Sequence, residues 1–138
     1  MNSRARRTTS SQKGIALLEV LISLLIFSLG ILGLIGLQTR AISLSVDAED
    51  RNRAALLANE VASTMWLQGS VTLSAEKLAA WQASVADLTK NGVPNGVGTV
   101  TAVTGTTNSA DVKITWHPPS RSSDAADESN FTTRVVLP

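Results

Sequence analysis

The stretch SSQKGIALLEVLISLLIFSLGILGLIGLQTR, residues 10–40, decides how the rest of the chain is organised. Its central part, Ile15 to Leu37, contains 23 residues, of which Glu19 is the only charged one. A helix of that length rises about 35 Å, enough to cross a hydrocarbon layer about 30 Å thick. The stretch therefore predicts a membrane-spanning helix over residues 15–37 that carries one carboxylate near its start.

The segments on the two sides of this apolar run carry opposite charge. Residues 1–14 contain four basic side chains and no acidic one: Arg4, Arg6, Arg7 and Lys13. The other 124 residues contain eight basic and eleven acidic side chains, so the overall net charge of +1 hides a basic leader and a mildly acidic body. By the positive-inside rule, we expect the N-terminus in the cytoplasm and the body in the periplasm. Such a body gives no support to direct nucleic-acid binding through bulk charge.

Several classes of protein are excluded by what the sequence lacks. A cleavable secretory signal has a shorter apolar region that ends in small residues, whereas this run is followed by Gln38-Thr39-Arg40. The absence of cysteine excludes disulfides, thiolate metal sites and cysteine nucleophiles. No phosphate-binding loop, nucleophile elbow or pair of catalytic carboxylates occurs in the sequence, so we predict no enzymatic activity and no cofactor.

The residues at the start of the apolar run form a specific motif. Lys13-Gly14 is followed by Ile15-Ala16-Leu17-Leu18-Glu19 and then by uninterrupted apolar sequence. This pattern resembles the prepilin N-terminus of type IV pilins and of the pseudopilins of type II secretion. The resemblance implies that a prepilin peptidase cleaves between Gly14 and Ile15, that Ile15 is methylated, and that Glu19 is the fifth residue of the mature chain. Ile15 departs from the phenylalanine or methionine that the family most often has at its position.

A carboxylate inside a membrane span costs about 2.5–3.5 kcal/mol at the centre of the span, so we expect Glu19 to have a partner. Cleavage after Gly14 leaves a free ammonium on Ile15, and Glu19 lies four residues later on the same helical face. Leaving one member of a buried ion pair alone costs about 3–5 kcal/mol. We therefore interpret Glu19 as an assembly residue. It pairs with the N-terminus of its own chain or of a neighbouring subunit and sets the register of the subunit.

Three glycines recur at a spacing of three in the second half of the span: Gly30, Gly33 and Gly36. They either allow close packing against other helices or make this part of the helix easier to extend, since glycine costs about 1 kcal/mol per helical site. The run from Ser28 to Gln38 also looks like the minor pilin subgroup called PilV. That resemblance implies a subunit that joins other minor pilins in a complex that primes assembly and lies near the filament tip.

Helical spacing continues beyond the membrane segment. Apolar residues follow one another at spacings of four, seven, three, four and three: Leu44, Ala48, Ala55, Ala58, Ala62 and Met65. The polar face is expected to contain Asp47, Glu49, Asp50, Arg51, Arg53 and Glu60. We predict one helix from residue 15 to about 67, about 80 Å long, which Gly69 ends. A shorter helix is predicted over about residues 75–88, with Ser74 as its N-cap.

Beyond Gly96 the spacing of apolar residues changes to two, which is typical of strands. Three segments rich in valine and threonine are predicted as strands: 97–104, 111–117 and 131–137. The side chains expected to face the long helix are Val112, Ile114 and Trp116 of the second strand, and Phe131, Thr133, Val135 and Leu137 of the third.

The predicted fold class is therefore α+β, a long N-terminal helix with a small antiparallel sheet packed on it. The chain is expected to consist of a leader (1–14), a membrane segment (15–37) and a periplasmic head (38–138). This is also the architecture that the pilin resemblance implies.

Three groups of residues invite a binding role but are explained more simply without one. His117, the only histidine, has no metal-binding or catalytic spacing around it and is expected on the surface. Asp124, Asp127 and Glu128 lack the regular spacing of a calcium loop, so the loop 120–130 is predicted to be solvated. Each of the tryptophans occupies an apolar stripe and is predicted in the core: Trp66, Trp81 and Trp116.

The sequence thus predicts a minor pilin of a bacterial type IV pilus, held in the inner membrane by a single span before it enters the filament. The resemblance implies other minor pilins, the major pilin, the prepilin peptidase and the pilus assembly platform as partners. A minor pseudopilin of a type II secretion system shares the N-terminal motif and stays an alternative. A single-span anchored periplasmic binding protein is a further alternative, which predicts that residues 1–14 stay attached and that Glu19 tolerates substitution.

Overall fold

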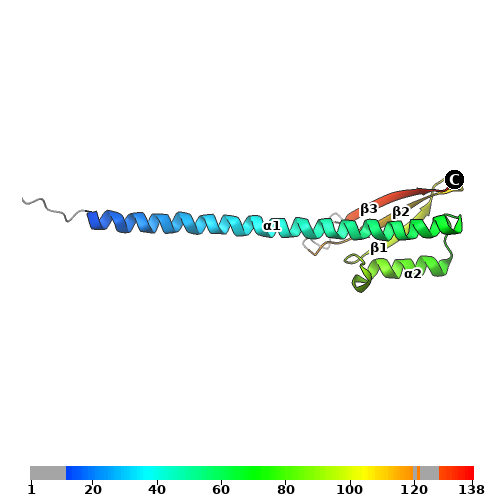
Figure 1. Ribbon diagram of the computed structural model, residues 1–138, viewed down its shortest axis with the longest axis horizontal. Helices are drawn as coiled ribbons and strands as arrows, with labels where there is room; N and C mark the ends of the chain where they lie inside the picture. The colour runs from blue at the N-terminus through cyan, green and yellow to red at the C-terminus, as the bar shows by residue number, and fades with distance from the viewer. Residues whose placement is uncertain (1–11, 120, 122–127) are drawn as a thin grey trace, which may run out of the picture. The chain divides into compact units, whose positions relative to one another are not determined.

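The computed structural model describes residues 12–119, 121 and 128–138 (Figure 1). Its elements follow in the order α1 (Gln12–Gln68), α2 (Ala75–Ala86), the short 3-10 helix η1 (Leu88–Lys90), β1 (Val97–Ala102), β2 (Ser109–Trp116) and β3 (Ser129–Val136). The chain forms two compact units, Met1–Ile42 and Ser43–Pro138, and the second is called the head below. A long N-terminal helix and a small antiparallel sheet confirm the predicted α+β class.

Gly69 ends α1, as the sequence predicts. Its φ of 64° lies in the left-handed region, which glycine adopts without steric cost. The Ser70 N–H donates to the Met65 carbonyl over 3.1 Å, and the Gly69 N–H donates to the Trp66 carbonyl over 3.2 Å. These two bonds form a Schellman motif, which satisfies carbonyls that the end of the helix would leave free.

The hydrophobic core of the head brings together α1, α2 and one face of the sheet. On β2, the predicted residues Val112, Ile114 and Trp116 are at most 2% exposed. On the third strand and just after it, Val135 and Leu137 are buried. Because these side chains alternate along their strands, one face of the sheet is apolar and the other is open to solvent.

The predicted stripe of α1 is correct for Ala58 and Met65, which are in the core, and for Ala62, which packs against it, but wrong at its start. Leu44 is 57% exposed and Ala48 is also exposed. The α1 side chains that enter the core are Ala54, Leu57, Ala58, Val61 and Met65. The sequence contains two apolar stripes on this helix, and the core forms on the one with the larger branched side chains, because these bury more apolar area. This choice also buries Asp50, which the sequence places on the polar face.

The core prediction for the tryptophans is correct for Trp81 and Trp116 and wrong for Trp66. Trp66 is 55% exposed. Its neighbour Met65 occupies the core position, and consecutive helical residues point about 100° apart. His117 is half-buried rather than fully on the surface, and its Nε2 atom is buried. Its backbone N–H donates to the Pro94 carbonyl over 3.1 Å.

The sheet has the strand order β1-β2-β3, with both neighbouring pairs antiparallel. β2 and β3 each begin two residues earlier and end one residue earlier than predicted, and α2 and β1 each end two residues earlier. α2 ends at Ala86 because the Asp87 carboxylate accepts a hydrogen bond from the Thr89 N–H over 2.9 Å and starts η1. β1 ends at Ala102, where a turn begins in which the Thr106 N–H donates to the Val103 carbonyl.

Candidate functional site

The predicted processing and assembly residues all lie on the exposed apolar part of α1. Gly14, Ile15 and Glu19 are helical and exposed. The large apolar side chains between Ile15 and Leu37 are 41–70% exposed. A helical segment that is apolar on all sides and exposed along its length needs lipid or other helices around it.

Ile15 and Glu19 lie four residues apart on this helix, and both have helical backbone. Side chains at this separation share a face, with their β-carbons about 5–6 Å apart. A carboxylate at residue 19 is therefore within reach of an ammonium at residue 15, if cleavage creates one. This geometry permits the pairing inferred from the sequence and does not by itself test it.

The three glycines of the span leave open surface on α1. A β-carbon added at Gly30, Gly33 or Gly36 would meet nothing within 4 Å. Among the described residues, none requires glycine at these positions. This open surface is compatible with close approach of a second helix in a membrane and equally with easier extension of the helix, so both roles stay predictions.

Within the described residues, α1 is the one helix long and apolar enough to cross a membrane. The sequence of its first half also matches a known family motif. The chain carries a prokaryotic N-terminal methylation motif, over residues 9–35. This finding supports a type IV pilin-like protein, either a pilin or a pseudopilin. No curated protein and no solved structure matches the chain.

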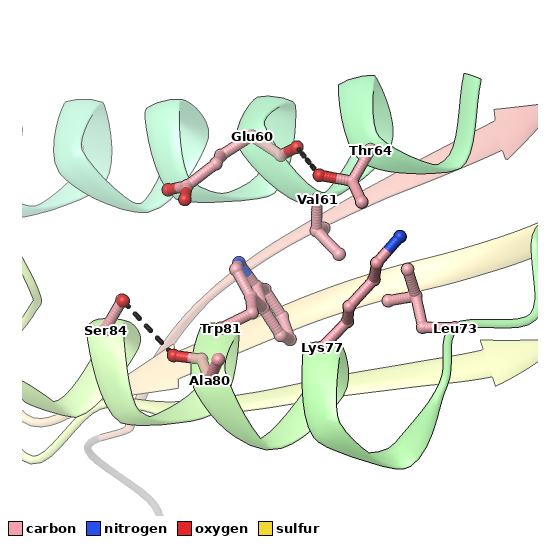
Figure 2. A pocket seen from close by; sticks show the side chains of 8 residues that line it. All are labelled: Glu60, Val61, Thr64, Leu73, Lys77, Ala80, Trp81 and Ser84. Carbon is pink, nitrogen blue, oxygen red and sulfur yellow. Dashed lines mark hydrogen bonds between the residues drawn. The ribbon is translucent and has the colours of Figure 1, made fainter. Parts of the chain in front are cut away.

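A groove in the head lies between α1 and α2 and has a volume of about 250 Å³ (Figure 2). It is lined by Glu60, Val61, Thr64, Leu73, Lys77, Ala80, Trp81 and Ser84. Its two hydroxyl groups are already used: Thr64 donates to the Glu60 carbonyl and Ser84 to the Ala80 carbonyl. The groove is therefore best understood as the junction where α2 packs on α1 rather than as a ligand site.

The candidates for metal binding gain no support. Asp124 and Asp127 lie outside the described residues, and Glu128 is exposed. The described ranges contain no group of three or more histidine, cysteine, aspartate or glutamate side chains that could hold a metal ion.

Asp50 is a charged residue of the head that the sequence predicts on the polar face of α1 and that is buried in the structure. Its side chain is 3% exposed, and in the described part of the chain its Oδ2 atom has no hydrogen-bond partner. Burial raises the pKa of the Asp50 carboxyl above its ordinary value of 3.8; Arg53 opposes the rise, while Glu49 and Asp47 add to it. The spacing of four to Ala54 and of eight to Ala58 could have identified Asp50 as a core-facing position.

We expect Asp50→Asn to stabilise the head by about 1 kcal/mol at pH 7, because burial removes hydration from the carboxylate and its Oδ2 has no hydrogen-bond partner among the described residues. In the unfolded chain the Asp50 carboxyl has its ordinary pKa of 3.8. In the wild type, the destabilisation caused by the buried carboxylate therefore grows as the pH rises from 3.8 through the raised folded pKa, and it is complete above that pKa. The gain from Asp50→Asn should therefore be full above the folded pKa and vanish below pH 3.8. Thermal unfolding of the full chain in detergent micelles, at several pH values, measures this difference.

Glu60→Gln is the matched control, because it makes the same change of charge at an exposed position of the same helix. Its effect should stay within about 0.5 kcal/mol at every pH. An Asp50→Asn chain that unfolds at a lower temperature than the wild type at pH 7 would show that the carboxylate stabilises the head.

Proposed function

We propose that this protein is a minor pilin of a bacterial type IV pilus, which helps to prime assembly of the filament or to cap it. The observation that carries the proposal is the N-terminal methylation motif, at the start of a helix whose first half is exposed and apolar. The inner membrane holds the subunit through α1 until it joins the filament, and the head lies in the periplasm. Its partners are the prepilin peptidase, the assembly platform and other pilins.

A minor role, as in the PilV subgroup, fits the composition of the chain. The sequence has no cysteine, so no disulfide fixes the segment before β3. A subunit that bears the load of the filament shaft benefits from such a cross-link, since a disulfide typically contributes about 2–4 kcal/mol. A minor pseudopilin of a type II secretion system has the same N-terminal requirements and remains the alternative.

The first test is the intact mass of the chain recovered from membranes of a host that expresses the cognate prepilin peptidase. We expect the mass to show loss of residues 1–14 and the addition of one methyl group on Ile15. Cleavage without methylation would keep the pilin assignment and attribute the missing methyl to isoleucine at this position. An uncut chain, beside another prepilin that the same peptidase cuts, would favour the anchored binding protein.

Processed chain alone does not separate the two systems. Filaments sheared from the cell surface, isolated from a strain without type II secretion, provide the second measurement. We expect the processed chain in this fraction at a level far below that of the major pilin. If the processed chain appeared in the sheared fraction only in a strain with an intact type II secretion system, the chain would be assigned to the pseudopilus.

A further inference from the structure

The two edges of the sheet differ in how they are covered. At the β1 edge, the Gln82 side chain donates to the Gly98 carbonyl over 2.9 Å. A β-carbon at Gly98 would lie 2.6 Å from the ring of Trp81, so α2 packs directly on this strand. β3 forms the other edge.

The hydrogen bonds of the sheet show which backbone groups of β3 point outward. The Leu137 N–H donates to the Asn108 carbonyl over 2.8 Å, which makes residues 108 and 137 a hydrogen-bonded pair. Such pairs alternate along an antiparallel ladder, and the register is continuous from Ser109↔Val136 to Trp116↔Ser129. The residues that direct their N–H and C=O groups away from β2 are therefore Asn130, Thr132, Arg134 and Val136.

Within the described residues, this outer edge is exposed and unprotected. All four outward-directed residues are exposed, and residues 12–119, 121 and 128–138 supply no backbone hydrogen bond to them. Natural edge strands are usually protected by lysine, proline, a bulge or a covering segment. β3 contains no lysine or proline, and its one charged side chain, Arg134, is held by Asp111 through two bonds of 2.7 and 2.9 Å.

We propose that the β3 edge receives an extended strand from the head of a different pilin-like subunit, which adds a fourth strand to this sheet. A row of outward N–H and C=O groups at strand spacing, without backbone partners among the described residues, is complementary to an added extended strand. A head-to-tail repeat of copies through β3 and β1 is disfavoured, because at the β1 edge the outward Gly98 carbonyl already accepts a hydrogen bond from Gln82 of α2. Pairing of two copies through their β3 edges is an outcome that the test below distinguishes. The proposal rests on the proposed function and names the contact through which a minor pilin joins its neighbour.

The half-buried side chains next to the edge indicate the chemistry of the incoming strand. Phe131 and Thr133 point to the core side of β3 and are only half-buried, whereas Thr132 and Arg134 point to the solvent side. A strand with apolar residues on its core side would complete the burial of Phe131, and polar residues would suit its other side.

Site-specific cross-linking tests this contact, because the chain has no cysteine and an introduced one is unique. Thr132 and Thr99 both pair with Lys113, so they lie in one row on the exposed face at opposite edges of the sheet. Full-length Thr132→Cys and Thr99→Cys chains are labelled with benzophenone maleimide in membranes of the native host and irradiated. We expect an adduct from residue 132 and none from residue 99. The partner must itself carry a prepilin methylation motif and be joined through an extended segment of its head.

A second variant tests the backbone bonds themselves. Thr132→Pro removes one outward N–H and leaves the β2–β3 ladder intact, whereas Thr132→Val keeps that N–H. We expect roughly tenfold less partner co-purified with the proline chain and an unchanged amount with the valine chain. Thermal unfolding of both chains checks the fold, and cross-linking of the Thr132→Cys chain decides the matter if the proline variant does not fold.

The proposal is wrong if residue 132 links to a second copy of this chain, to another part of the same chain, or to nothing while the chain is processed normally. In that last case the proposed function stands and only the strand contact fails. A chain that is not processed at all overturns both.

Discussion

A Glu19→Gln chain is expected to be processed and inserted normally but to be almost absent from filaments. If the carboxylate meets the N-terminal ammonium of a neighbouring subunit, its removal leaves a buried cation without a partner. That loss is estimated at about 3–5 kcal/mol, which corresponds to at least a hundredfold lower incorporation. The expected measurement is the ratio of the chain in sheared filaments to the chain in membranes, by quantitative immunoblot.

Two variants separate the charge of Glu19 from its other properties. Glu19→Ala should lose incorporation as Glu19→Gln does, whereas Glu19→Asp keeps the charge on a shorter side chain and should retain part of it. Glu60→Gln makes the same substitution in the head and should leave incorporation unchanged. Equal amounts of wild-type and Glu19→Gln chains in the filament fraction would rule out a role for this carboxylate in setting the register.

The N-terminal half of the fold could be predicted because its determinants are local. An apolar run of 23 residues specifies a spanning helix through its own composition, without any contact to the rest of the chain. The end of α1 is local as well, since Gly69 provides the left-handed residue that closes the helix. The candidate processing residues share this property, because the motif depends only on fixed offsets from Gly14.

The buried face of α1 could not be predicted from spacing alone. The stripe through Leu44 and Ala48 and the stripe through Leu57 and Val61 both have helical periodicity. The core contacts decide between them, and they bury Asp50 at the edge of the chosen face. The core prediction for Trp66 is wrong for the same reason. A helix that packs through one face leaves a large apolar residue of its other face in solvent.

Which edge of the sheet is open could not be predicted from the sequence either. Three strands with alternating patterns are compatible with several orders, and the order determines which strand lies at an edge. Only the pairing β1-β2-β3 and the position of α2 distinguish the covered edge from the open one. The sequence of β3 contains no lysine or proline of the kind that protects an edge strand. This becomes informative only once the strand is known to lie at an edge.

Trp81→Ala is expected to cause the largest loss of stability in the head. Trp81 is 5% exposed, its Nε1–H donates to the Leu57 carbonyl of α1 over 2.9 Å, and its ring packs on Gly98 of β1. One side chain thus connects α2 to both α1 and the sheet. Truncating a buried tryptophan to alanine costs about 3–5 kcal/mol, and for a domain of this size each 1 kcal/mol lowers the melting temperature by about 4–8 °C. We expect a fall of more than about 12 °C, measured by thermal unfolding of the full chain in micelles.

The chain offers a matched control in Trp66→Ala, the same substitution on a side chain that is 55% exposed. Its effect should stay within about 0.5 kcal/mol, because little packing is lost at an exposed site. Trp81→Phe keeps an aromatic ring but loses the hydrogen bond to Leu57, so it should fall between the two alanine variants. If Trp81→Ala and Trp66→Ala unfolded at the same temperature, Trp81 would not hold α2 against α1 and β1. The packing of α2 at the β1 edge, which limits the proposed strand addition to β3, would then lack support.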